Sequence, residues 1–204
     1  MILYITRHGE TEWNVQKRFQ GQTNSELTSN GIEGARKLGE FLVGEDIDLI
    51  IASPLKRTVE TADIIKKNID IPVVYDKRLM EICAGDLEGQ QFDIARKKYG
   101  TVMKEIRSYP FVTPYPSGES IMDVYNRISQ FIEDIKKKYK DKNILIVTHG
   151  VVVKCMYYYL NFGQITKWDK PSIENCSLTK FKIEDNCNEK IIFNDVSHLS
   201  LVTN

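Results

Sequence analysis

The sequence predicts an α/β fold with an open sheet, and three patterns support this prediction. Short apolar runs, typical of buried strands, alternate along the chain with stretches of helical period. Two of these runs, 2–6 and 144–147, end in similar polar sequences that contain histidine and glycine. Near the C-terminus, 177–183 and 190–193 show the alternation of a half-exposed hairpin, which we expect to form an antiparallel edge of the sheet.

The two similar strand ends contain His8 and His149, two of the three histidines in the chain. Ligands of open α/β sheets bind beyond the carboxyl ends of the strands, so we expect both imidazoles to face one crevice, with Arg7 beside them. A guanidinium repels cations and pairs well with oxyanions, and this set therefore suits a phosphoryl group better than a metal. Because the sequence contains no carboxylate cluster either, we expect no metal and no cofactor.

The size and charge of the chain narrow the classes of function. Its 204 residues fit a single domain over 1–204 that carries an insertion. The 28 basic and 28 acidic residues balance, so no overall field attracts nucleic acid or an anionic membrane. No apolar run approaches the roughly 20 residues that span a bilayer, and no secretion signal is expected. The expected partner is a small phosphorylated substrate, and the expected assembly is a monomer or a homodimer.

The four cysteines, at 83, 155, 176 and 187, lack the C-x-x-C spacing of metal and redox sites. Reduced thiols in a cytoplasmic protein are therefore the expected state. A bridge between Cys176 and Cys187 is the alternative.

Capping residues and apolar spacing predict two helices that flank a second strand. Thr28 or Ser29 caps the first helix, whose buried face comprises Ala35, Leu38, Phe41 and Leu42. Ser53 as N-cap and Pro54 at the first position are predicted to start the next helix, whose buried side comprises Leu55, Val59, Ala62 and Ile65. Arg57 leans toward the positive end of this helix, a natural anion site. A surface arginine is the alternative for Arg57 taken alone.

Further candidate site residues lie in the connecting segments. Asn14 offers an amide, and Gln20, Gly21 and Thr23 belong to a polar loop at the carboxyl end of the first strand, although a solvated loop is the alternative. Glu81 is a lone carboxylate among apolar neighbours, which should raise its proton affinity and suit it to proton transfer. A capping or salt-bridged glutamate is the alternative there.

The segment at about 86–118 is basic and aromatic and ends in a proline-rich return, which predicts a helical lid over the crevice. It precedes the clearest amphipathic helix, whose buried stripe comprises Ile121, Val124, Tyr125, Ile128, Phe131, Ile132 and Ile135. A further packed helix follows His149. His198 has no partner motif and is expected at the surface.

Several motifs of the chain resemble those of the histidine phosphatase superfamily, the phosphoglycerate-mutase-like proteins. The N-terminal motif is Thr6-Arg7-His8-Gly9-Glu10-Thr11-Glu12-Trp13-Asn14. The others, in order, are Ser53-Pro54-Leu55-Lys56-Arg57, Glu60-Thr61-Ala62, Glu81 with Gly85 and Glu88-Gly89, Ser117-Gly118-Glu119-Ser120, and Thr148-His149-Gly150. Together they span most of the chain. The resemblance implies a three-layer α/β/α sandwich with a mostly parallel central sheet, an antiparallel edge strand and a helical lid insertion.

The resemblance also implies a role for each matching residue. His8 becomes phosphohistidine, Glu81 protonates the leaving oxygen, and the phosphoryl group is held by Arg7, Arg57 and His149 with the help of Asn14. Charge spreads over three oxygens in the transition state, and two guanidiniums with a protonated His149 would stabilise it. To act as a nucleophile, His8 needs a carbonyl partner on its far nitrogen, which we expect from the backbone near Gly9.

Hydrolysis of a phosphate monoester is the expected reaction, and phosphoglycerate mutase is the alternative. The mutase branch has Arg-His-Tyr after the acid and an aromatic residue after the loop glycine, whereas this chain has Ile82-Cys83-Ala84 and Gln22. The basic residues at 96–107 keep the mutase alternative open, since they could bind a second acidic group of the substrate. A non-catalytic phosphate-binding protein of the same fold is a less favoured alternative.

The chain departs from the family pattern at the mouth of the site. Asn24 and Glu26 stand where many relatives have Asp and Pro, and Leu87 replaces the usual aromatic residue before Glu88. These departures leave the chemistry in place and the identity of the substrate open.

Overall fold

The computed structural model describes residues 1–168, 172–184 and 187–200, and it is centred on a six-stranded sheet in the order β3-β2-β4-β1-β5-β6. The parallel strands are β1 (Ile2–Arg7), β2 (Leu49–Ala52), β3 (Val73–Tyr75) and β4 (Ile144–Thr148). An antiparallel hairpin, β5 (Leu178–Ile183) and β6 (Asn188–Asp195), completes one edge. The mostly parallel sheet and its antiparallel edge are confirmed.

The register of β1 and β4 brings the two histidine-bearing strand ends together. Arg7 lies opposite Thr148, so that His8 and His149 leave the sheet side by side. The backbone N–H of His8 donates to the carbonyl of Thr148 at 2.9 Å. β4 is buried along its whole length, which explains its unbroken run of aliphatic residues.

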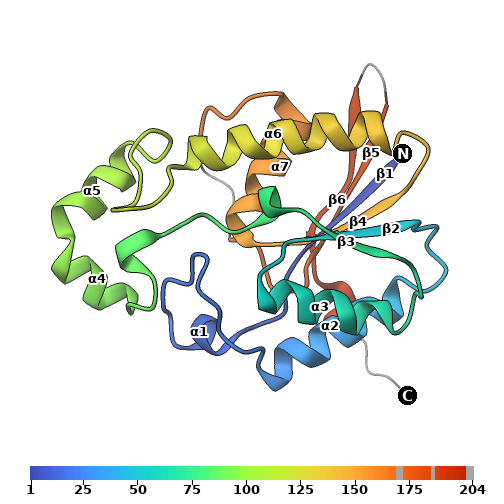
Figure 1. The fold of residues 1–204 in the computed structure, drawn as a ribbon, viewed down its shortest axis with the longest axis horizontal. Helices are drawn as coiled ribbons and strands as arrows, with labels where there is room; N and C mark the ends of the chain where they lie inside the picture. Colours follow the sequence, from blue (N-terminus) through green and yellow to red (C-terminus); the bar gives the residue numbers. More distant parts are fainter. Residues whose placement is uncertain (169–171, 185–186, 201–204) are drawn as a thin grey trace.

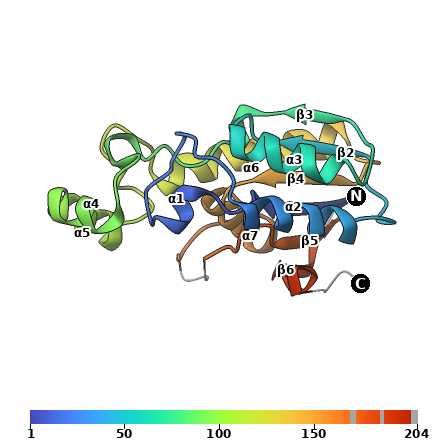
Figure 2. The same cartoon turned by 90° about the horizontal axis from the view of Figure 1, so that it is seen from below.

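Two pairs of helices cover the two faces of the sheet, as the three-layer prediction requires (Figures 1 and 2). One pair is α2 (Ser29–Phe41) and α3 (Lys56–Lys66), which share a core with β2 and β4. The other pair is α6 (Ile121–Lys138) and α7 (Gly150–Phe162), which share the larger core. All seven residues of the stripe predicted for α6 are buried, and Ser120 caps this helix through a capping box with Asp123.

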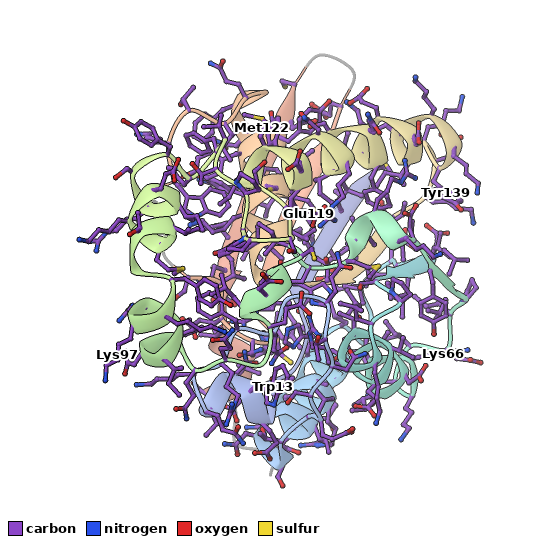
Figure 3. All side chains as sticks on the ribbon, turned by 60° about the vertical axis from the view of Figure 1, so that its left-hand side comes forward. Trp13, Lys66, Lys97, Glu119, Met122 and Tyr139 are labelled. Carbon is purple, nitrogen blue, oxygen red and sulfur yellow. The ribbon has the colours of Figure 1, made fainter. Side chains whose placement is uncertain are left out.

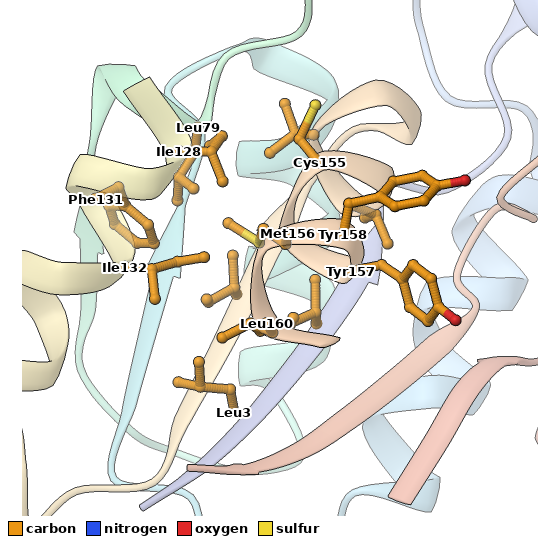
Figure 4. Packing of buried hydrophobic residues seen from close by; sticks show 14 of the residues in the cluster. Leu3, Leu79, Ile128, Phe131, Ile132, Cys155, Met156, Tyr157, Tyr158 and Leu160 are labelled. Carbon is orange, nitrogen blue, oxygen red and sulfur yellow. The ribbon is translucent and has the colours of Figure 1, made fainter. Parts of the chain in front are cut away.

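The larger core is built mainly by α6 and α7 against β1 and β4. Phe131 and Ile132 of α6 face Met156 and Leu160 of α7, with Leu3 of β1 beneath them (Figure 4). Full burial of one such apolar side chain stabilises the folded state by about 1.5–3 kcal/mol relative to leaving it exposed. This packing fixes the sheet, and with it the strand ends that carry the histidines.

The two helices on the opposite face differ in detail from the prediction. Thr28 caps α2 by accepting from the N–H of Gly31, but Phe41 is 39% exposed because Leu38 and Leu42 take the core positions. The prediction that Ser53 and Pro54 start α3 is wrong: the helix begins at Lys56, and its N-cap is Leu55 without a side-chain cap. The hydroxyl of Ser53 is instead engaged by His149.

The predicted insertion contains two short helices beyond the carboxyl ends of the strands. They are α4 (Phe92–Lys98) and α5 (Gly100–Ser108), which lie apart from the sheet near α1 (Glu12–Val15) in Figure 1. Three 3₁₀ turns complete the list of elements: η1 (Lys77–Leu79), η2 (Gly85–Leu87) and η3 (Ser197–Ser200). A single domain over 1–204 with a lid insertion at about 86–118 stays a prediction.

Two further expectations are corrected or resolved by the structure. His198 is buried rather than at the surface, because its Nε2 donates to the carbonyl of Cys176 at 3.0 Å and its ring packs on Phe41. Cys176 and Cys187 are both free, so the alternative of a bridge between them is wrong. Over the described ranges, none of the helices combines the length and apolar character that crossing a membrane requires.

Candidate active site

A cavity of about 220 Å³ lies at the carboxyl ends of the parallel strands. It brings together seven of the nine residues that the sequence nominates: Arg7, His8, Asn14, Gln20, Gly21, Arg57 and Glu81. His149 lies beneath the cavity, fully buried, with its ring centroid 5.2 Å from that of His8. Thr23 lies outside it.

His8 is fixed in the form that a nucleophile requires. Its Nδ1 donates to the carbonyl of Gly9 at 2.7 Å, as the sequence predicts, so the proton resides there and Nε2 keeps its lone pair. Burial lowers the pKa of His8 well below its usual range, and Arg57 and Arg7 lower it further. The imidazole is therefore neutral over the physiological pH range.

His149 has a different environment from His8. Its Nε2 shares a hydrogen bond of 2.8 Å with the hydroxyl of Ser53, and its Nδ1 has no partner in the part of the chain that the structure describes. Burial, and then Arg57, His8 and Arg7, lower the pKa of His149 well below its usual range. The protonated His149 expected from the sequence is thus disfavoured in the free site, and an adjacent oxyanion would shift the balance toward protonation.

The two arginines are held by backbone carbonyls. Arg57 is fully buried and donates from Nη2 to Gly21 O at 2.6 Å and from Nη1 to Thr23 O at 2.9 Å. Arg7 donates from Nη1 to Ile173 O at 2.6 Å. Burial lowers the pKa of Arg57 to about 10 and also lowers that of Arg7, and in both cases Glu81 opposes the effect.

Neither Arg7 nor Arg57 has its charge fully compensated. The Nε groups of both side chains are buried and unpartnered among the described residues, and no ion pair there includes either side chain. A buried cation with a free N–H is costly unless an anion binds it. The two guanidiniums, which line the same cavity as His8, therefore form a site for an oxyanion.

Glu81 is the carboxylate that lines the same cavity. Its Oε1 accepts from the N–H of Ile82 at 3.0 Å and its Oε2 from that of Val151 at 3.4 Å. The side chain of Arg127 donates to the Glu81 carbonyl at 3.2 Å and pairs with Glu119, and these bonds hold this segment against α6. The raised proton affinity expected for Glu81 stays a prediction.

The remaining nominated residues, Asn14, Gln20, Gly21 and Thr23, form hydrogen bonds with other parts of the protein. The side-chain oxygen of Asn14 accepts from the N–H of Thr11 at 3.1 Å, and the amide of Gln20 donates to the hydroxyl of Thr11. Gly21 contributes its carbonyl to Arg57. The hydroxyl of Thr23 donates to Glu88, so its expected contact with substrate has no support in this geometry.

Sequence reasoning missed several residues of the site. Arg18, Phe19, Phe92 and Tyr115 also line the cavity. Arg18 and Phe19 directly precede Gln20 and could have been nominated with it, whereas Phe92 and Tyr115 are brought in by the fold of the insertion. The basic residues of 96–107 do not line this cavity: Arg96, Lys104 and Arg107 line a separate surface hollow, and Lys97 lies on the outer side of α4 (Figure 3).

In the described ranges, no group of three or more histidine, cysteine, aspartate or glutamate side chains is arranged to hold a metal ion. An α/β sandwich in which a neutral histidine, two guanidiniums and a carboxylate line one cavity defines a class of protein: enzymes that transfer phosphoryl groups through histidine. The profile of the histidine phosphatase superfamily (branch 1) matches residues 3–196. The chain belongs to this family.

Known relatives agree with this assignment over nearly the whole chain. Phosphoserine phosphatase 1 of Hydrogenobacter thermophilus is 30% identical, with 97% of this chain and 93% of the relative covered. A probable phosphoglycerate mutase, GpmB, of Proteus mirabilis is also 30% identical, with 97% and 94% covered. Among solved structures, YhfR of Bacillus stearothermophilus is similar with a TM-score of 0.91 and 33% identity, over 98% of this chain and 99% of that one.

Proposed function

We propose that this protein is a metal-independent hydrolase of phosphate monoesters that works through a phosphohistidine at His8. The observation that carries the proposal is the neutral His8, with its Nε2 free, in the cavity that Arg7 and Arg57 also line. The buried Nε groups of both arginines have no partner among the described residues. An imidazole of this kind attacks phosphorus, and the guanidiniums bind the equatorial oxygens.

The first half-reaction transfers the phosphoryl group to the enzyme. His8 Nε2 forms a bond to phosphorus while the bond from phosphorus to the ester oxygen breaks. Glu81 gives its proton to the leaving oxygen, which departs as the alcohol, and the carboxylate remains. Arg7 and Arg57 stabilise the charge on the three equatorial oxygens, and His149 adds a donor from below the cavity.

The second half-reaction hydrolyses the phosphohistidine. The Glu81 carboxylate takes a proton from a water molecule, whose oxygen forms the new bond to phosphorus as the bond from phosphorus to His8 Nε2 breaks. Inorganic phosphate leaves, His8 regains its lone pair, and Glu81 is again protonated. Asn14, Gln20 and Gly21 line the same cavity, and the carbonyl of Gly21 holds the Arg57 guanidinium in place.

The relatives support small phosphorylated hydroxy compounds as the substrate class, since one is named for phosphoserine and another for phosphoglycerate. A mutase remains the second candidate, because the second relative is named a probable phosphoglycerate mutase. The basic lid residues that favoured it do not line the cavity, so hydrolysis is the better supported reaction. We further propose a cytoplasmic protein, monomeric or homodimeric, with no nucleic-acid or membrane partner.

Turnover of p-nitrophenyl phosphate in the presence of EDTA tests the proposal. We expect hydrolysis by the full chain and its loss in His8→Ala, with His198→Ala as the control for removal of a buried histidine outside the cavity. No hydrolysis, together with interconversion of phosphoglycerates on addition of 2,3-bisphosphoglycerate, would assign the mutase reaction instead. Absence of both reactions and of any phosphohistidine would leave a binding protein.

A further inference from the structure

Glu88 lies at the root of the insertion, outside the cavity, and connects two segments that contribute to the site. Its Oε1 accepts from the N–H of Gln22 at 2.9 Å and from that of Ala84 at 3.1 Å. Its Oε2 accepts from the N–H of Thr23 at 2.9 Å and from the hydroxyl of the same residue at 2.5 Å. Four donors on one carboxylate fix it firmly, because hydrogen bonds to a charged group are the strong ones.

The loop that Glu88 holds is the loop that holds Arg57. The guanidinium donates to the carbonyls of Gly21 and Thr23. Thr23 is itself bonded to Glu88, and Gly21 directly precedes Gln22, the other loop residue that donates to Glu88. Arg57 has no carboxylate partner among the described ion pairs, and a third acceptor, Asn24 Oδ1, lies 3.5 Å from Nη1. The two shorter bonds, to the carbonyls of Gly21 and Thr23, therefore set most of its orientation. A shift of the loop would therefore turn the guanidinium away from the phosphoryl group.

The contact between Glu88 and this loop leaves no spare room. A Cβ on Gly21 would lie 2.0 Å from Glu88 Oε1, and the backbone of Gly21 has φ +54°. Only glycine accepts both conditions without strain. The carboxylate is thus seated directly against the residue whose carbonyl binds Arg57.

The same carboxylate also reaches the segment of the proton donor. Ala84 lies three residues after Glu81, and the side chain of Gln22 donates to the Glu81 carbonyl at 3.1 Å. The loop that binds Arg57 and the segment that carries Glu81 are therefore joined through Glu88 and Gln22. This arrangement fixes the position of Arg57, which would bind the phosphoryl group, relative to Glu81, which would supply the proton.

We propose that Glu88 is a positioning residue for phosphoryl transfer, which acts by fixing the 21–23 loop so that its carbonyls aim Arg57 at the phosphoryl group. The proposal rests on the proposed function, in which Arg57 binds the transferring group. Glu88 itself touches neither substrate nor reacting atoms, since it does not line the cavity.

Kinetics of Glu88→Ala on p-nitrophenyl phosphate, in the full chain, test this role. We expect kcat/KM to fall about 10- to 100-fold, the effect typical of a small misplacement of a catalytic group, and inhibition by vanadate to weaken in parallel. The matched control is Glu133→Ala, which removes a half-buried glutamate that is bonded to Tyr159 and Lys136 and does not line the cavity. A purely structural role would lower the melting temperature and leave kcat/KM and vanadate inhibition of the folded enzyme unchanged.

Two double-mutant cycles identify the path through which Glu88 acts. In the background of Arg57→Gln, Glu88→Ala should cost less than about threefold, because the group that it positions is gone. Gly21→Ala should cost less in the Glu88→Ala background than in the wild type, because the clash with the carboxylate is gone and only the strain of the positive φ remains. Effects that multiply in both cycles would overturn the proposal.

The outcomes separate this proposal from the function on which it rests. A wild-type chain that hydrolyses no phosphate monoester would contradict the proposed function, whatever Glu88 does. An active wild type whose kcat/KM changes less than twofold in Glu88→Ala would contradict the role of Glu88 alone. If Glu88→Ala does not fold, Thr23→Val removes one of the four bonds to Glu88 and should lower kcat/KM about threefold. An unchanged kcat/KM in Thr23→Val would overturn the proposal.

Discussion

The ends of β1 and β4 are similar in sequence, yet their histidines have different partners. His8 donates from Nδ1 to a backbone carbonyl and presents Nε2 to the cavity. His149 engages Ser53 through Nε2 and lies beneath the cavity, fully buried. The sequence pattern identifies both histidines, but the partners of the two rings differ. In the proposed mechanism this difference assigns attack on phosphorus to His8 and stabilisation of the charge to His149. The predictions below test this difference.

The largest effect is expected for removal of the His8 imidazole. His8→Ala should lower kcat/KM for p-nitrophenyl phosphate by more than about 10⁴-fold, because the proposed mechanism makes its imidazole the nucleophile. Steady-state assays with the folded variant measure this. A residual rate within 100-fold of the wild type would mean that water is the direct nucleophile and that His8 only binds.

A smaller loss is expected for His149, because the role proposed for it is to stabilise charge. His149→Ala should lower kcat about 10²- to 10³-fold and still form phosphohistidine in a rapid-quench experiment, only more slowly. A complete absence of phosphoenzyme, equal to that of His8→Ala, would contradict the separate roles of the two strand ends.

Ser53 should matter only through His149. Ser53→Ala removes the hydroxyl that orients the His149 ring and should reduce kcat/KM about tenfold, the value of one hydrogen bond to a group that becomes charged. In a His149→Ala background the same change should have almost no effect. Equal losses in both backgrounds would assign Ser53 a role of its own.

Stability should fall as the pH becomes acidic. The pKa values of His8, His149 and His198 are all lowered in the folded protein, with burial as the main cause. Below about pH 6.5 the unfolded histidines therefore bind protons that the folded ones do not. The free energy of unfolding should then decrease by up to about 1.4 kcal/mol per pH unit for each histidine.

Urea titrations between pH 8 and pH 5 measure this slope. His149→Gln should make the dependence of the unfolding free energy on pH shallower by the contribution of one histidine, while the contributions of His8 and His198 stay the same. A free energy of unfolding that rises as the pH falls through 6.5 would contradict the neutral state that the buried rings require.

The smallest effect is expected for the basic residues of the insertion. Lys104→Ala combined with Arg107→Ala should change kcat/KM for p-nitrophenyl phosphate less than twofold, because both side chains line a hollow separate from the cavity. The same variant assayed for phosphoglycerate interconversion addresses the mutase alternative. A specific loss of that activity would show that the insertion closes over the substrate.

Much of the fold could be predicted because its strands and helices have strong local patterns. The stripe of α6 from Ile121 to Ile135 has an unbroken helical period and is buried as expected. The start of α3 was missed because the hydroxyl of Ser53 serves a histidine almost a hundred residues away instead of capping the helix. His198 was misplaced for a related reason, since its partner is a backbone carbonyl that no motif marks.

The residues of the site were predictable where chemistry requires a particular side chain. His8, Arg57 and Glu81 converge on one cavity as expected. The sequence could not indicate that the free site favours neutral His149, because this depends on burial next to two guanidiniums. It also could not show the four bonds of Glu88, three of which come from a loop far away in the sequence.

Direct detection of the phosphorylated residue tests the central claim. The wild-type enzyme, mixed with p-nitrophenyl phosphate and quenched in alkali within milliseconds, is digested and analysed by mass spectrometry. We predict a single phosphorylated peptide that contains His8, with a modification that is stable in alkali and lost in acid. A phosphoryl group on another residue, or none at a time when product has already formed, would contradict the account.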